Sequence, residues 1–168
     1  MPIVSGDIQV RLSGGGANTD PNASLGGAIS STAIVDATLH NLFREINEDE
    51  TAAGITLYRC FYFRNNHGTL TWKNVKQWIQ TNTPSPDTTV AIAFGSSGVN
   101  GTEQTVADEI TAPTGVTFAS PTDKATGQAV GDVPTTHHFP VWVRLTVTAG
   151  AAAYDDSCVI RSGGGTAA

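Results

Sequence analysis

The chain has 168 residues, of which only 14% are charged, and its formal net charge is −6 with nine Lys and Arg residues. This length suits one domain with a hydrophobic core, with or without an extended arm, and is too short for two ordinary domains. Nucleic acid is an unfavourable partner because phosphate binding needs clustered cations, and these cations are scattered. No apolar run approaches the roughly 18 residues of a membrane-spanning helix, so we expect no membrane partner.

Residues 1–33 have the pattern of an extended N-terminal arm. A short alternating run of Ile8, Val10 and Leu12 is followed by SGGGANTDPNASLGGAISS, which is rich in turn-forming residues. Such a segment cannot bury enough apolar surface to fold alone, so we expect neighbouring molecules to order it. The opening MPIVSGDIQVRL lacks the features of a signal peptide, and we therefore expect synthesis in the cytoplasm.

The stretch TLHNLFREIN, residues 38–47, favours one short helix or a pair of turns. Leu39, Leu42, Phe43 and Ile46 recur at helical spacing, and Gly54 follows as a terminating residue. We expect Leu42, Phe43 and Ile46 to pack on a sheet.

After Gly54 the apolar pattern changes to a period of two, which is typical of strands. Turn clusters such as NTPSPD, GSSGVNG and SPTDKATG separate the runs. The expected strands are ITLYRCFYFRN, TLTWKNVKQWIQT, TTVAIAFG, GVTFAS, FPVWVRLTVTA and SCVIRS. About seven short strands without helices between them predict an all-β fold, an antiparallel β-sandwich with an extended arm and one short helix. We assign the sandwich to residues 34–163 and a C-terminal tail to residues 164–168.

The run LYRCFYFRN, residues 57–65, carries aromatic side chains on both faces, which indicates a central strand. We expect Phe61 and Phe63 to fill the core and Tyr58 and Tyr62 to face a loop or a second layer. Arg59 or Arg64 is expected to pair with an acidic residue at the rim.

No pattern of reactive side chains predicts a catalytic, cofactor-binding or metal site. Cys60 and Cys158 lack zinc-site spacing, and they are either two buried free thiols or a long-range disulfide. His137 and His138 are adjacent and would point to opposite faces of a strand. The acidic run around Glu48 is typical of a solvated turn.

The three tryptophans, Trp72, Trp78 and Trp142, allow two interpretations. They either pack in the core or stack on a partner such as a sugar ring. Because Val141 and Val143 share one strand face, Trp142 and Arg144 share the other, which we take as a candidate partner-binding surface.

Several segments resemble a domain found in structural proteins of tailed bacteriophages. They are YRCFYFRN (58–65), TNTPSPDTTVAIAFGSSGVNGTEQTVADE (81–109), TAPTGVTFASP (111–121) and VWVRLTVTAGAAAYDD (141–156). The resemblance covers about two thirds of the chain and leaves the glycine-rich arm outside. It implies a virion component, most similar in character to a capsid decoration, or cement, protein.

The resemblance implies a non-enzymatic protein on the outer surface of a phage head, which binds the major capsid protein and itself, as a trimer, and stabilises contacts between capsomers. Neck, tail or baseplate components and a host-surface glycan-binding module remain alternatives. With the arm as the binding element, deletion of residues 1–15 should abolish capsid binding and leave the sandwich folded. The expected partner-binding residues are Ile3, Val4, Ile8, Val10, Leu12, Trp142 and Arg144.

Overall fold

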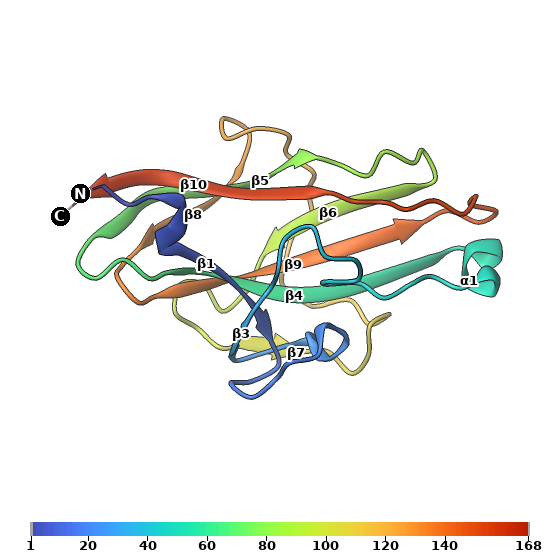
Figure 1. The fold of residues 1–168 in the computed structure, drawn as a ribbon, viewed down its shortest axis with the longest axis horizontal. Coiled ribbons are helices and arrows are strands. Elements are labelled where there is room, and N and C mark those ends of the chain that lie inside the picture. Colours follow the sequence, from blue (N-terminus) through green and yellow to red (C-terminus); the bar gives the residue numbers. More distant parts are fainter. Residues whose placement is uncertain (1, 168) are drawn as a thin grey trace.

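A computed structural model describes residues 2–167, which form ten strands in three antiparallel sheets (Figure 1). The large sheet has the order β3 (Ile29–Ala33), β1 (Ile8–Ser13), β4 (Ile55–Asn65), β9 (His138–Val147) and β6 (Thr88–Phe94). The small sheet has the order β10 (Val159–Ala167), β5 (Thr71–Thr81) and β8 (Gln128–Val133). A third sheet pairs β2 (Gly26–Gly27) with β7 (Glu103–Thr105).

Helices are few and short in residues 2–167. They are α1 (Glu48–Ala53) and the 3-10 helices η1 (Ser5–Asp7) and η2 (Pro21–Ala23). No helix in this described range has the length and apolar character needed to span a membrane. The predicted all-β class is therefore confirmed, with more strands than the seven that we expected.

Apolar side chains lie on both faces of the large sheet. On the inner face, Phe61, Phe63 and Val141 pack with Val75 and Ile79 of the small sheet in the main core. On the outer face, a second cluster lies near the two-stranded sheet and its flanking loops; its buried members are Cys60, Ala93, Val106 and Trp142. Burial is continuous along the middle of both central strands, from Arg59 to Phe63 in β4 and from Phe139 to Val143 in β9, as expected for strands covered on both faces.

The central strand is β4, as the sequence predicted. It pairs with β9 from Ile55 to Arg64, and on its other edge with β1 from Phe61 to Asn65. Where β1 ends, Cys60 N–H donates to the carbonyl of Ser24 at 2.9 Å, and Tyr58 N–H donates to that of Glu109 at 2.7 Å. Loops thus continue the hydrogen bonding along this edge of β4.

The N-terminal segment is part of the sandwich, which corrects the predicted arm. β1 lies between β3 and β4, and Leu12 is only 2% exposed. One of the glycines that suggested an extended arm allows two strands to lie very close together. At Gly26 (φ +94°) in β2, a Cβ atom would lie 1.8 Å from the carbonyl oxygen of Gln104 in β7. At the other end, the predicted tail from residue 164 to 167 belongs to β10.

The helix also begins later than expected, at Glu48 rather than near Thr38. The Asn47 side chain accepts a hydrogen bond from Glu50 N–H, and the Glu50 carboxylate accepts one from Asn47 N–H, which together form a capping box. Residues 38–47 form turns instead, although Leu42 and Phe43 pack against the main core as predicted.

Two strand predictions also differ from the structure. The segment GVTFAS, which we expected to be a strand, forms only a single bridge, between Ala119 and Ile92, and strand β8 was not predicted.

Deletion of residues 1–15 should abolish the cooperative thermal transition of the chain. It removes β1, exposes the edge of β4 from Phe61 to Asn65, and uncovers part of the main core. Circular dichroism melting measures the effect. Deletion of residues 1–4, which precede η1, serves as the control and should keep a single transition. A folded 1–15 deletion variant would contradict the placement of β1 and restore the arm.

Candidate binding groove

The two main sheets are closed against each other on one side. Segment 119–121 bonds to both of them: Ala119 exchanges hydrogen bonds with Ile92 of β6, and Ile79 N–H of β5 donates to the carbonyl of Pro121 at 2.8 Å. The Gln128 side chain of β8 also donates to the Ile92 carbonyl. The end of β10 is bonded by Ile3, whose N–H donates to the Thr166 hydroxyl at 3.2 Å. Among the described residues no hydrogen bond joins residues 159–162, at the start of β10, to the large sheet, so the sandwich is open there.

An apolar groove of about 1940 Å³ occupies the open side. Its floor is the inner face of the large sheet, where Val10 and Leu145 are partly exposed and Phe61, Phe63, Val143 and Val147 are buried beneath the groove. One wall is the start of β10 with the preceding segment 151–158, and the other is segment 36–48. The groove follows from a mismatch in size, since a three-stranded sheet covers only part of a five-stranded one.

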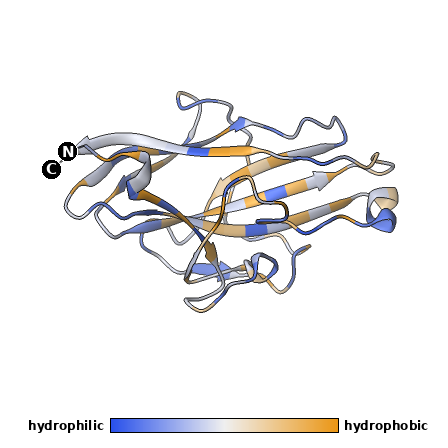
Figure 2. Cartoon of the chain, in the orientation of Figure 1, coloured by the Kyte–Doolittle hydropathy of each residue, from blue (hydrophilic) through white to orange (hydrophobic). Residues whose placement is uncertain are grey.

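The edge of β10 that faces away from β5 has no backbone hydrogen bond among residues 2–167. Two bonds reach its far end, from Ile3 N–H to the Thr166 hydroxyl and from the Lys124 ammonium to the Gly164 carbonyl. Residues 159–162, which line the groove, have neither. Figure 2 shows this start of β10 as apolar and its glycine-rich end as neutral. A free strand edge beside an apolar groove is suited to pairing with another extended chain.

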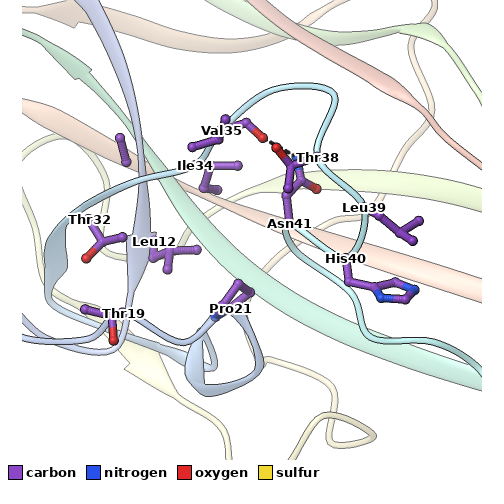
Figure 3. A pocket seen from close by; sticks show the side chains of 11 residues that line it. Leu12, Thr19, Pro21, Thr32, Ile34, Val35, Thr38, Leu39, His40 and Asn41 are labelled. Atoms are coloured by element: carbon purple, nitrogen blue, oxygen red, sulfur yellow. Dashed lines mark hydrogen bonds between the residues drawn. The ribbon is translucent and has the colours of Figure 1, made fainter.

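Exposed apolar side chains concentrate at the mouth of the groove. Of the six large hydrophobic residues that are exposed in the described chain, Leu39, Tyr154 and Val159 line it. A fourth, Val35, lines a smaller hollow of about 190 Å³ on the other side of the same loop, where the Asn41 amide donates to the Val35 carbonyl (Figure 3). Exposed apolar side chains that line one groove are typical of an interaction surface.

An ion-pair network holds the wall of the groove formed by segment 36–48. Arg44 lies between Glu50 and Glu109, with Nη2–Oε1 distances of 2.5 and 2.7 Å. Glu109 also pairs with Arg59, whose side chain is fully buried in β4 and lies 5.8 Å from the Phe43 ring centroid. The predicted pairing of Arg59 with an acid is confirmed, although Arg59 is buried rather than at the rim.

The pKa values of the two carboxyls reflect this network. Burial alone would raise the pKa of Glu109, but hydrogen bonds and positive charge from Arg59 and Arg44 outweigh it and hold the pKa below its ordinary value. A hydrogen bond from Arg44, with a second from Asn47 N–H, lowers the pKa of Glu50 to about 2. Both groups are therefore anionic at neutral pH, and Arg44 joins them across the wall.

The mouth of the groove is acidic. Four exposed carboxylates line it without an ion-pair or side-chain hydrogen-bond partner in residues 2–167; they are Asp36, Glu45, Glu48 and Asp155. Arg161 is the exposed cation among the lining residues. The mouth thus favours a positively charged partner.

The structure separates the predicted partner-binding residues. Ile8 and Val10 line the groove, while Ile3 packs at the edge of the main core and Val4 is exposed. Leu12 and Trp142 are buried within the chain, so neither is available to a partner.

The predicted face of Trp142 and Arg144 is covered as well. Arg144 lies over the Phe118 ring at 5.1 Å, on the outer side of the large sheet. Trp72 is buried in the main core and Trp78 is half-buried, so among the tryptophans only Trp78 offers part of its ring to a ligand.

Sequence reasoning missed the residues at the mouth. Leu39 was expected in one short helix or a pair of turns, whereas Tyr154 lies in the irregular segment before β10 and Val159 at the start of that strand. Tyr154 and Val159 lie in the adjacent runs AAAYDD and SCVIRS. Their exposure depends on the size of the small sheet, whose three strands cover only part of the large sheet.

The two cysteines are free thiols, which confirms one of the two interpretations. Cys60 is buried in the outer cluster, and Cys158 packs at the edge of the main core. Burial raises the pKa of Cys158 to about 11 and that of Cys60 well above its ordinary value, so both are protonated at neutral pH. Within residues 2–167, no group of three or more His, Cys, Asp or Glu side chains is arranged to hold a metal ion.

Comparison with known proteins does not assign the chain to a family. No family model, no curated protein and no solved structure matches it.

Replacing Arg59 with Met should destabilise the chain by about 1–3 kcal/mol, because the partly buried Glu109 carboxylate loses its hydrogen-bonded partner in β4 and keeps only Arg44. The Lys73→Met variant is the control, since it breaks an exposed pair with Asp132 that contributes under about 1 kcal/mol. Urea denaturation measures both. Equal losses of stability would show that the Arg59 network is no more important than a surface pair.

Proposed function

We propose that the chain is a non-enzymatic binding protein that attaches to a protein partner through the groove beside β10. The observation that carries this proposal is the combination of an apolar groove with a free strand edge at its wall and exposed Leu39 and Tyr154 at its mouth. Covering such side chains favours binding by roughly 25 cal/mol per Å² of apolar surface removed from water, before the costs of association. Nothing in this mode of action requires a reactive group.

Within this class, we propose a capsid decoration protein of a tailed phage, bound to the major capsid protein on the outside of the head. Support comes from the resemblance of segments 58–65, 81–109, 111–121 and 141–156 to phage structural proteins. Three of these four segments contribute strands of the large sheet, and the last one ends beside the groove. Assembly as a trimer remains a prediction. A place at the neck, tail or baseplate remains an alternative to the capsid surface.

The groove changes how such a protein would attach. The sequence suggested that an N-terminal arm reaches a neighbour, but β1 is held within the large sheet. We infer instead that the decoration protein offers a preformed site and that the neighbour supplies the segment that becomes ordered. A rigid site loses less conformational entropy on binding than an arm that must fold.

The Leu39→Ser/Tyr154→Ser double variant should bind phage particles that lack this chain at least about tenfold more weakly than the unchanged protein, because it removes two apolar groups from the mouth. The matched control is Ile110→Ser. Ile110 is 61% exposed, similar to the 62% of Tyr154, and does not line the groove.

Binding is measured by sedimentation with the particles and by quantitative mass spectrometry against the major capsid protein. The proposal predicts that the unchanged chain saturates at a simple ratio to the capsid protein. Absence of binding by the unchanged, folded chain would overturn the capsid assignment, and equal binding by the double variant and the control would remove the groove from it.

A further inference from the structure

We propose that the occupant of the groove is an extended segment of the partner protein, which adds to β10 as a fourth strand of the small sheet and carries apolar residues in alternation with Lys or Arg. This inference rests on the proposed function in one respect, namely that the partner is another protein. It goes further in naming the conformation, the pairing strand and the charge of the segment.

The backbone of β10 supplies the first requirement. Its pairing with β5 uses one edge, and the other edge has unpaired N–H and C=O groups along residues 159–162. An added strand would lie about 4.8 Å from β10 and satisfy these groups. It would also extend the small sheet over the part of the large sheet that three strands leave uncovered.

The floor of the groove supplies the second requirement. A strand placed beside β10 directs alternate side chains toward the large sheet, where Val10 and Leu145 are partly exposed and present apolar surface. The side chains between them point away from the floor. The occupant is therefore expected to alternate apolar and polar residues over about six positions, the length of the wall from Ser157 to Ser162 and of an ordinary strand.

Charge supplies the third requirement. Among residues 2–167, the carboxylates of Asp36, Glu45, Glu48 and Asp155 at the mouth have no side-chain partner, and Arg161 is the one exposed cation that lines the groove. A segment with Lys or Arg at its outward positions complements this surface. A second copy of this chain is less suitable, because its net charge is −6 and it would approach an acidic mouth.

The test uses the full chain and a short synthetic peptide that alternates Val with Lys and Thr, labelled for fluorescence anisotropy. Two control peptides have the same apolar residues. In one, Glu replaces Lys; in the other, the backbone amides of one edge are N-methylated and cannot pair with a strand. We expect the Lys peptide to bind, and each control to bind at least about tenfold more weakly, from the loss of charge complementarity or of backbone hydrogen bonds.

Two protein variants locate the binding. Asp36→Asn/Asp155→Asn raises the net charge by two at the mouth and should weaken the Lys peptide several-fold. Ala125→Lys/Ala129→Lys raises it by the same amount at exposed positions near and on β8, at the opposite edge of the small sheet, and should have little effect. In parallel, NMR-detected amide exchange should slow at residues 159–162 when the Lys peptide is bound.

The inference is overturned if the Lys peptide does not bind, if either control peptide binds equally well, or if exchange at residues 159–162 is unchanged. Its failure is distinct from failure of the proposed function. Weaker particle binding by the Leu39→Ser/Tyr154→Ser variant, without peptide binding, would keep the groove as a docking site and reject strand addition. Peptide binding without particle binding would keep strand addition and reject the capsid partner.

Discussion

A three-stranded sheet cannot cover a five-stranded one, and this constraint explains most of what is distinctive in the molecule. On one side, segment 119–121 and Gln128 join the sheets and complete the core. On the other side, the inner face of the large sheet has the partly exposed Val10 and Leu145, and among residues 2–167 no strand of the small sheet lies beyond β10. Apolar surface in that position normally lies beneath another strand, so the groove has the character of a core that lacks one element.

The turns between Asp36 and Asn47 cover part of this surface, and an ionic contact holds them in place. Arg44 joins Glu50 of α1 to Glu109, and Glu109 in turn reaches the buried Arg59 of β4. The wall is thereby tied to the central strand, while Leu39 at its outer side stays 72% exposed. A wall that is fixed in position with its apolar side chains uncovered provides a preformed surface, which limits the conformational entropy lost when a partner binds.

Strand periodicity predicted the sandwich, the central position of β4 and the core roles of Phe61 and Phe63, because alternation is a local property of the sequence. The same alternation in Ile8, Val10 and Leu12 was outweighed by the glycines that follow, although Gly26 permits the chain to cross close to Gln104. Trp142 was expected near a surface, since nothing local predicts the two-stranded sheet that lies over it. The groove depends on how many strands each sheet contains, which is set by pairing between distant segments and has no local signal. The acidic mouth of the groove likewise contains Asp36 and Asp155, which are far apart in the chain, so no local pattern predicts that they share one surface.

The central claim is that the groove beside β10 is covered by a partner when the protein is assembled. Hydrogen exchange of the chain bound to phage particles, compared with that of the free chain, tests it most directly. We expect slower exchange in residues 36–47 and 151–162 on assembly, with little change in β8 at the opposite edge of the small sheet. Unchanged exchange around the groove, with protection confined to β8 or to the outer face near β2 and β7, would contradict it.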